Sequence, residues 1–417
     1  MAKNDKERVT AHCKRFNIFH DYGHVLRTPN NPRATSELIG SLVVEDVRAK
    51  SKKRPVDVVT DMKKDYGLNV TYHQAWWGVE KARGDVFGDY EISFSSLKWY
   101  VSAAKSTNPG SHIELEIDEE MKRFKRLFVA FGECINGFNH CRPLLFLDGT
   151  HLKGRQRGHL LAATGKDGNQ ANRNQGLLEA VRMVFPNSCH GYCLFHLKWN
   201  LRHHLRGTQP GFKAYLINLM LRSAYAPTQE LFYDNMHNLI ADGGNQMSGF
   251  LSNLQLQHWA NAFFPSQRYG EMYSHVAESF NSWIEDERYL PIKPLVDAIR
   301  VKVMNLIVER REIASKWAGK ICPQMDKKLT DRFYDSRTWV VSESGYGVYE
   351  VHAQPIVTVD IGNRSCSCKQ WQQDGFPCCH AVGTITSSVK YLVDYVDPYY
   401  YSQTFRDSYC VDALTTN

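Results

Sequence analysis

The stretch CSCKQWQQDGFPCCH, residues 366–380, decides how the C-terminal part of this 417-residue chain folds. Cys366 and Cys368 form a CxC pair, and after nine intervening residues Cys378 and His380 form a CxH pair. Residues i and i+2 of an extended strand point to the same face, so Cys366 and Cys368 can bind one ion. Four such ligands within fifteen residues are typical of Zn²⁺. The alternative is a cluster of small buried cysteines, which the tight spacing disfavours.

The segment between the two pairs contains a turn-forming sequence, Asp374-Gly375-Phe376-Pro377. Such a turn can fold the second pair back onto the first. The residues from Ala381 to Thr386 are expected to form a short helix that starts at His380. Cys379 interleaves the second pair and is the odd cysteine out.

The segment Cys366–Val382 resembles a SWIM zinc finger, whose pattern is CxC, a variable gap and CxH. The surroundings Trp371-Gln372 and Gly375-Phe376-Pro377-Cys378 are similar to the version found at the C-terminal end of plant Mutator-like transposases. The resemblance implies a structural Zn²⁺ and leaves Cys379 outside the site. The ligands that it implies are Cys366, Cys368, Cys378 and His380. Because such fingers serve both DNA-binding and protein-binding roles, the finger alone does not define a function.

The composition describes a folded, mildly basic chain. Hydrophobic residues make up 43% and aromatic residues 12%, the formal net charge is +7 and the pI is near 8.7. This balance suits a nucleic-acid partner without requiring one. No apolar run reaches transmembrane length, so no membrane association is expected. The eleven cysteines are expected to be reduced, as in the cytosol or nucleus, where clusters indicate metal rather than disulfides.

Residues 1–34 are polar and turn-rich, and we interpret them as a remnant N-terminal segment. Cys13 and His20 in this segment could be the remains of a second zinc finger, but further ligands are not recognisable. The basic run Lys50–Pro55 could be a nuclear import signal, or simply a solvated surface.

Residues 35–118 are predicted to form a helical domain. Thr35 or Ser36 caps the first helix, Pro55 begins the second, and Thr71 begins the third. In the third helix the residues expected to face inward are Trp76, Trp77 and Val79, and those expected to face outward are Lys81 and Arg83. This helix-turn-helix-like arrangement could place a helix in a DNA groove, or it could be an ordinary packing module.

Leu144–Leu147 is predicted to be a buried strand that ends at Asp148, and Gly158–Thr164 a second strand. A carboxylate fixed at the end of a strand is typical of metal-dependent phosphoryl-transfer sites, although Asp-Gly is also a common turn. Helical periodicity follows in six segments, and strand-like alternation returns over Thr338–Ile361. The helical segments are 175–183, 195–205, 212–224, 228–240, 274–288 and 294–317.

The blocks LDGTHLKG, starting at Leu147, and HLLAATGKD, starting at His159, closely resemble the first catalytic region of the Mutator-like transposase domain. Further similar blocks follow in the same order: Arg173–Val181, Cys193–His196 and Val276–Asn281. The resemblance implies an RNase H-like fold with an Asp-Asp-Glu site, in which Asp148 is the first carboxylate and Glu278 the third. In this family the carboxylates hold a pair of Mg²⁺ ions for DNA strand cleavage and joining.

The second aspartate of this pattern is absent. Asn172 occupies its position, and only four residues separate Asp167 from Asn172, where the family has a strand, a helix and another strand. A neutral side chain cannot help to neutralise two divalent ions. We therefore expect an incomplete core with an internal segment missing near residue 170. Asp167 is the nearest carboxylate that could substitute.

Cys193 and His196 lie three residues apart on a predicted helix and could share one face. They could contact metal or DNA, but no second ligand pair is evident, so a packing role is the stronger interpretation. Glu278 could equally be a solvated acid on an amphipathic helix.

The predicted fold class is α/β plus all-α: an incomplete RNase H-like core with a helical insertion, an N-terminal helical domain and a small β-rich zinc finger. After residues 35–118, the predicted divisions are a transposase-like domain at 140–318, the finger at 338–390 and a tail at 391–417. The resemblance implies a nuclear, transposase-derived zinc-binding protein that binds DNA, and the missing second aspartate indicates that it has lost catalysis. The alternatives are an active transposase, which would need Mg²⁺, and a protein-interaction module acting through the finger. The sequence does not indicate an oligomeric state.

Overall fold

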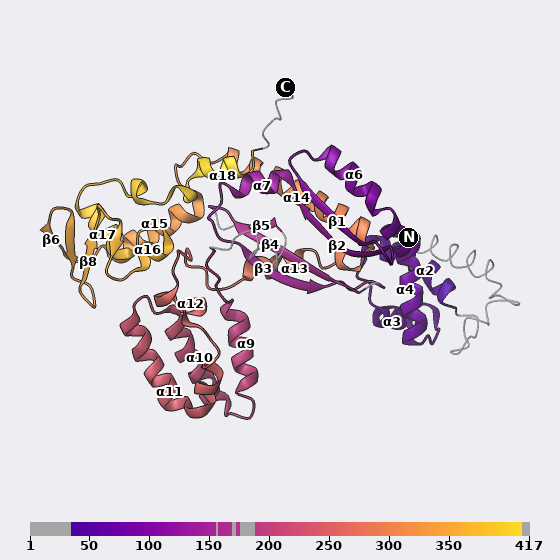
Figure 1. The fold of residues 1–417 in the computed structure, drawn as a ribbon, viewed down its shortest axis with the longest axis horizontal. Helices are drawn as coiled ribbons and strands as arrows, with labels where there is room; N and C mark the ends of the chain where they lie inside the picture. The colour runs from indigo at the N-terminus through magenta and orange to yellow at the C-terminus, as the bar shows by residue number, and fades with distance from the viewer. Residues whose placement is uncertain (1–34, 156, 169–171, 176–187, 411–417) are drawn as a thin grey trace, which may run out of the picture. The chain divides into compact units, whose positions relative to one another are not determined.

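The computed structural model describes residues 35–155, 157–168, 172–175 and 188–410 as a mixture of helices and small sheets (Figure 1). The described chain divides into two compact units. The first contains the described part of Met1–Gly132, with Gly149–Leu161 and Phe280–Leu306. The second contains Glu133–Asp148 and the described parts of Ala162–Ser279 and Ile307–Asn417. No helix in these described ranges has both the length and the apolar composition needed to cross a bilayer.

Three helices begin the first unit, as the sequence predicts: α2 (Ser36–Ala49), α3 (Pro55–Tyr66) and α4 (Tyr72–Phe87). The Thr35 hydroxyl accepts a hydrogen bond from the Leu38 amide at the start of α2. Thr71 and Gln74 form a reciprocal capping box at the start of α4. These caps satisfy backbone donors that the first helical turns leave without partners. The three helices share a core that includes Ile39, Val43, Val58, Met62, Ala75 and Val79.

Two predictions for α4 are wrong. Arg83 is buried rather than outward-facing, and it forms an ion pair with buried Glu80. Its guanidinium also donates to the Ser51 carbonyl oxygen at 2.9 Å. Trp77, expected inside, is 39% exposed. The helical period explains both differences, because Arg83 lies four residues from Val79, whereas Trp77 lies on another face.

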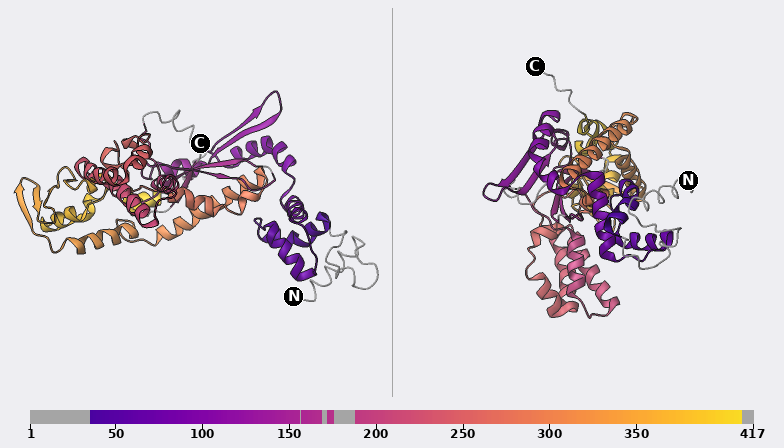
Figure 2. Two further views of the ribbon diagram at one scale, coloured as in Figure 1. Left: turned by 90° about the horizontal axis from the view of Figure 1, so that it is seen from below. Right: turned by 90° about the vertical axis from the view of Figure 1, so that its right-hand side faces the viewer.

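The rest of the first unit contains a β-hairpin that the sequence does not predict. After α5 (Tyr90–Ser95) and α6 (Leu97–Thr107), strands β1 (His112–Asp118) and β2 (Arg123–Ala130) pair antiparallel, with His112 opposite Ala130. Figure 2 shows them as an extended two-stranded ribbon. The prediction of an all-helical region over 35–118 is therefore wrong at its end. The charged residues along β1 and β2 obscure the alternation that indicates a strand.

A three-stranded sheet with the order β3-β4-β5 follows: β3 (Phe146–His151), β4 (His159–Lys166) and β5 (Asn172–Gln175). β4 and β5 are antiparallel, with Ala163 opposite Gln175. β3 begins two residues later than predicted and continues past Asp148 to His151, so Asp148 lies within the strand and not at its end. The short helix α7 (Gly132–Phe138) precedes this sheet.

Helices α9 (Leu194–His204), α10 (Pro210–Tyr225), α11 (Gln229–Leu251) and α12 (Leu256–Trp259), with the 3₁₀ turn η2 (Asn261–Phe263), share one apolar core. Buried Phe232 and Trp259 belong to this core, with their ring centroids 5.6 Å apart. α11 extends eleven residues beyond the predicted end at Ile240. It is kinked at Gly244, whose φ of 52° suits a residue without a Cβ.

The predicted helix at 274–288 is divided into α13 (His275–Trp283) and the 3₁₀ turn η3 (Glu287–Tyr289). Two long helices follow, α14 (Ile292–Ser315) and α15 (Pro323–Ser336). Nearly all of the predicted helix at 175–183 lies outside the described residues.

The last part of the second unit is a four-stranded antiparallel sheet with two short helices. The strands are β6 (Val341–Gly345), β7 (Val348–Val351), β8 (Val357–Asp360) and β9 (Ser365–Cys366), and the helices are α16 (Gln370–Asp374) and α17 (Cys379–Ser387). The described residues beyond 391 form η4 (Leu392–Tyr395), η5 (Pro398–Tyr400) and α18 (Ser402–Ser408). Buried Val396 and Tyr400 pack against Met325 and Leu329 of α15.

Candidate metal centre

Strand β9, the turn after it and the start of helix α17 carry the four predicted zinc ligands. Cys366 is the last residue of β9, and Cys368 follows in a turn that the Lys369 amide closes on the Cys366 carbonyl oxygen at 2.8 Å. The expected extended CxC pair is therefore wrong, because the strand ends at its first cysteine. Cys378 caps the N-terminus of α17, and His380 lies in the first turn of that helix, as predicted.

The ligand atoms are close enough to share one ion. His380 Nδ1 lies 3.8 Å from Cys366 Sγ and 3.9 Å from Cys378 Sγ, and all four ligand atoms lie within 4.8 Å of one another. Tetrahedral zinc with bonds of about 2.0–2.3 Å keeps its ligands roughly 3.3–3.8 Å apart. Cys366 and Cys378 are buried, and the other two ligands are half-buried. Such a closed set of three thiols and one imidazole fits a structural zinc site.

Burial and mutual hydrogen bonding shift the pKa values of the three thiols in different directions. Hydrogen bonds from Cys366 and Cys378 hold the pKa of Cys368 far below its usual value. The hydrogen bond to Cys368 raises the pKa of Cys366 to about 12, and the pKa of Cys378 is raised by its hydrogen bonds to both neighbours and by burial. Because zinc binds thiolates, its binding must displace the protons of the thiols whose pKa is raised.

Two side chains outside the predicted ligand set orient the ligands. The ring of Trp339 stacks on His380, with centroids 4.8 Å apart and planes 22° apart. The Gln372 side chain accepts from the Cys366 amide at 3.2 Å and donates to the Cys366 carbonyl oxygen at 3.0 Å. Such supporting contacts fix ligand orientation before metal binds. Gln372 belongs to the resemblance to the transposase finger, whereas no signal in the sequence indicates Trp339.

Arg332 of α15 fixes the turn between the two ligand pairs. Its guanidinium donates to the carbonyl oxygens of Phe376 at 3.2 Å and Pro377 at 2.5 Å, and to Asp374 Oδ2 at 3.1 Å. Gly375 within this turn has a φ of 62°, which a side chain would strain. The predicted turn is confirmed, but the residue that holds it lies more than forty positions away in sequence.

Cys379 does not belong to the cluster of four. Its Sγ lies 4.0 Å from the Asp335 carboxylate on α15, in agreement with the expectation that it is not a ligand.

The comparisons with known proteins agree with this geometry. Residues 356–388 match the SWIM zinc finger family. The match contains all four clustered residues, so the centre is the metal site that defines this class of zinc finger. No curated protein and no solved structure matches the chain.

The residues that the transposase resemblance assigns to catalysis lie in three places. Asp148 is half-buried in β3, Glu278 lies on α13, and Asn172 begins β5. Glu278 groups with Cys193 and His196 and not with Asp148, which is in neither of the metal-ligand clusters found in the described ranges. Cys13 and His20 lie outside the described residues.

Asp167, the candidate substitute for the missing carboxylate, is fully buried. Its Oδ2 accepts a hydrogen bond of 2.6 Å from the Tyr409 hydroxyl. A catalytic magnesium ligand must reach substrate and water, so this buried position argues against the substitution.

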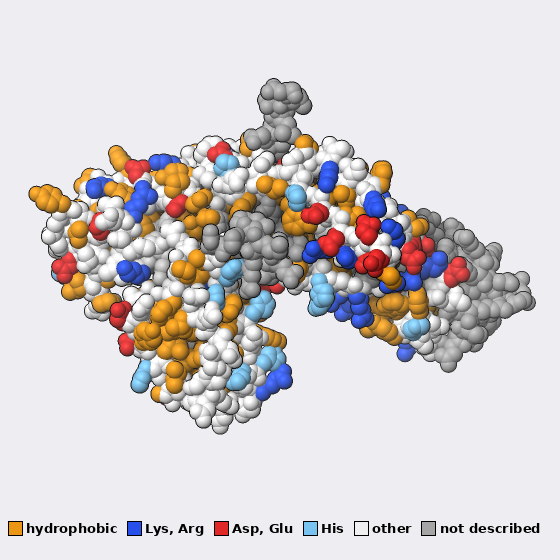
Figure 3. All heavy atoms as spheres, viewed as in Figure 1, with side chains coloured by type: hydrophobic (Ala, Val, Ile, Leu, Met, Phe, Trp, Pro, Cys, Tyr) orange, Lys and Arg blue, Asp and Glu red, His pale blue; other side chains and the backbone are white. Residues whose placement is uncertain are grey.

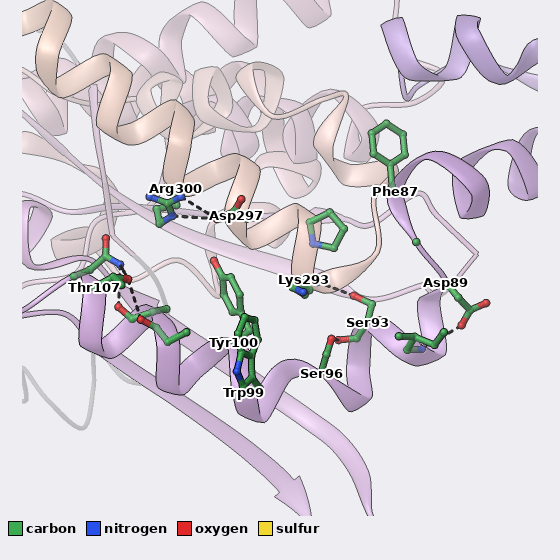
Figure 4. A pocket seen from close by; sticks show the side chains of 16 residues that line it. Phe87, Asp89, Ser93, Ser96, Trp99, Tyr100, Thr107, Lys293, Asp297 and Arg300 are labelled. Atoms are coloured by element: carbon green, nitrogen blue, oxygen red, sulfur yellow. Dashed lines mark hydrogen bonds and ion pairs between the residues drawn. The ribbon is translucent and has the colours of Figure 1, made fainter.

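The first unit contains a separate cleft of about 760 Å³ between α6 and the start of α14 (Figure 4). Its charged side chains contact their neighbours. Asp297 and Arg300 form an ion pair of 3.0 Å, and Lys293 Nζ lies 5.3 Å from the centre of the Trp99 ring. The ion pair lies within α14, whereas the Lys293 contact joins α14 to α6, so the charged groups of the cleft have structural partners.

Proposed function

We propose that this chain is a zinc-binding protein derived from a Mutator-like transposase, and that it binds DNA without carrying out strand transfer. The observation that carries the zinc assignment is the cluster of Cys366, Cys368, Cys378 and His380 within the SWIM match. The order of the catalytic-block resemblances supports the transposase derivation.

The surface that we assign to DNA lies on α9. Phe195 and Trp199 are 41% and 51% exposed, Arg202 and His203 are exposed further along the same helix, and Arg206 is exposed in the turn just after it. Histidine and basic side chains gather along the edge of this helical group in Figure 3. Arginine neutralises phosphate, and exposed aromatic rings can stack on sugars and bases. An exposed surface with both kinds of side chain is typical of nucleic-acid binding.

Three observations support the loss of catalysis. The second acidic position holds Asn172, Asp167 is buried with Tyr409, and Glu278 lies beside a thiol and an imidazole. Two-metal strand transfer needs carboxylates that converge on one point. The DNA-binding function can persist without them, because phosphate contacts need only the basic surface.

The test is binding of the purified full chain to duplex DNA over a range of salt concentrations, combined with a Mg²⁺-dependent nicking assay. We expect binding that weakens steeply with salt and no cleavage of terminal-repeat DNA. Cleavage that Asp148→Ala abolishes would show that the chain is an active transposase. Absence of any salt-sensitive binding would contradict the DNA assignment.

A second candidate function is protein binding by the finger. Its surface is not basic: over residues 338–390 the basic residues outside the core are Arg364, Lys369 and Lys390, and the acidic ones are Glu343, Glu350 and Asp360. Tyr346 and Ile356 are exposed on it. A charge-balanced surface with exposed apolar side chains suits a protein partner better than phosphate. DNA binding that is unchanged after Tyr346→Ser and Ile356→Ser would agree with this division of roles.

We also propose a nuclear location, which a transposase derivation requires. The basic run near residue 52 is not a freely exposed import signal. Lys52 pairs with Glu285, Lys53 with Asp46 and Asp61, and Arg54 with Asp57. If this run directs import, the importing partner must replace those carboxylates, and a fluorescent fusion with Lys52 and Lys53 changed to alanine would test it.

A further inference from the structure

The structure contains a second cluster of metal-binding side chains, far in sequence from the finger. It consists of Cys193, His196 and Glu278, whose ligand atoms all lie within 4.8 Å of one another. Cys193 caps the N-terminus of α9, His196 lies in the first turn of that helix, and Glu278 lies in the first turn of α13. Cys193 and Glu278 are half-buried, and His196 is exposed.

Backbone hydrogen bonds bring the two helices to this point. The Leu194 amide donates to the Met272 carbonyl oxygen at 2.9 Å, which places the segment before α13 against the start of α9. The Ser274 amide donates to Cys193 Sγ at 3.2 Å, and the Glu278 amide donates to the Ser274 carbonyl oxygen at 3.1 Å. Hydrogen bonds from backbone amides therefore hold Cys193 and Glu278 near each other, so their proximity does not depend on the positions of surface side chains alone.

We propose that Cys193, His196 and Glu278 bind a second zinc ion. The donor set is one sulfur, one nitrogen and one carboxylate oxygen, a combination that zinc accepts in tetrahedral geometry. Magnesium is disfavoured here, because it requires oxygen ligands in an octahedral arrangement. Ligands of a tetrahedral zinc lie roughly 3.3–3.8 Å apart, so separations of at most 4.8 Å require only rotamer adjustments of about an ångström.

This site differs in kind from the finger. It has three protein ligands and one of them, His196, is exposed, so the fourth position of the ion is open to water or another ligand. Structural zinc sites use four protein ligands, whereas sites with three leave a position free. The ion would link α9 to α13 and lies at the start of the helix that carries Arg202, so it would also stiffen the surface assigned to DNA. The metal site itself does not rest on the DNA-binding proposal.

Zinc stoichiometry of the full chain tests the proposal. After exposure to zinc and removal of the excess, we expect two zinc ions per chain by elemental analysis and native mass spectrometry. His196→Asn should remove one ion, and because this residue is exposed, the fold should persist. Glu278→Gln should likewise leave only one zinc ion per chain. Cys189→Ser is the matched control, since this exposed cysteine lies four positions before Cys193 in sequence but outside the cluster, and this variant should retain both zinc ions.

Cobalt substitution identifies the ligands directly. In a chain whose finger is disabled by Cys366→Ser and Cys368→Ser, we expect one remaining Co²⁺ with a thiolate charge-transfer band that Cys193→Ser abolishes. One zinc ion per wild-type chain would overturn the proposal, as would two ions that persist in both His196→Asn and Glu278→Gln. Circular dichroism of each variant separates loss of a ligand from loss of the fold.

Discussion

The guanidinium of Arg332 lies 3.1 Å from the carboxylate of Asp374, and both side chains are buried. This ion pair joins helix α15 to the loop between the two pairs of zinc ligands. The same guanidinium donates to two carbonyl oxygens of that loop, so a single residue holds the backbone that positions Cys378. The finger is thus fixed by α15 as well as by its metal ion.

Replacement of Arg332 should therefore weaken the finger without touching a ligand. Arg332→Met leaves the Asp374 carboxylate buried without its guanidinium partner, and breaking a buried pair costs about 3–5 kcal/mol. We expect a lower free energy of unfolding of the finger and weaker zinc binding, measured by competition with a chromophoric chelator. Lys327→Met, an exposed change on the same helix, is the control. Equal zinc affinity in the two variants would contradict the role assigned to Arg332.

Removal of zinc should unfold the finger selectively. Zinc in small structural sites contributes on the order of 10–16 kcal/mol at neutral pH. A strong chelator, or Cys368→Ser, should make residues 340–390 sensitive to protease while α2–α6 stay resistant. Cys379→Ser is the matched control, because its thiol lies beside Asp335 and outside the cluster. Digestion of the finger at the same rate with and without metal would exclude a structural zinc.

Zinc affinity should rise with pH. The pKa of Cys366 is raised to about 12 in the metal-free cluster, chiefly by its hydrogen bond to Cys368, so its proton must leave when zinc binds. Protons therefore compete with the metal, and the stability that zinc supplies is lost as the pH falls. Titrations at pH 5.5 and pH 7.5 should show tighter binding at the higher value. Affinity that is independent of pH would indicate that these thiols do not bind the ion.

Loss of charge on α9 and in the turn that follows it should weaken DNA binding in a salt-dependent way. Each phosphate contact contributes about one to the slope of log affinity against log salt, so Arg202→Ala with Arg206→Ala should reduce that slope by about two. The control is an equal loss of charge on α10, Lys213→Ala with Arg222→Ala. Fluorescence anisotropy with a random duplex measures both. If the slope falls equally in both double variants, the effect comes from the net charge of the protein and not from a DNA-binding surface at Arg202 and Arg206.

Cysteine reactivity should separate buried from exposed thiols. Burial raises the pKa of Cys322 to about 12, so at pH 8 only about one part in ten thousand is thiolate. Cys189 is exposed and should react with maleimide in the folded, zinc-loaded chain, while Cys322 reacts only after denaturation. Peptide mass mapping measures the extent of labelling at each of the two cysteines. Rapid labelling of Cys322 in the folded chain would show that this part of the core opens readily.

The local parts of the fold could be predicted from the sequence, because local chemistry specifies them. Thr35 and Thr71 start helices through hydroxyl groups that accept from amides within the next turn, and Gly67 ends a helix in the left-handed conformation. The hairpin of β1 and β2 could not be predicted, because charged residues on its strands hide the alternation. Arg83 was misplaced for a related reason: a charged residue is expected outside unless its partner, here Glu80, is known to be buried with it.

The four residues Cys366, Cys368, Cys378 and His380 were identifiable as candidate zinc ligands from the sequence by itself, because their spacing within fifteen residues already limits how far apart they can lie. Tertiary structure alone decided the rest. It placed Arg332 beside Asp374, Trp339 on His380, and Glu278 beside Cys193 and His196. These partners are separated by about 40–85 positions, and no local pattern encodes contacts over such distances. These contacts form only when the helices pack together and bury apolar surface, and the local sequence does not show which surfaces will meet.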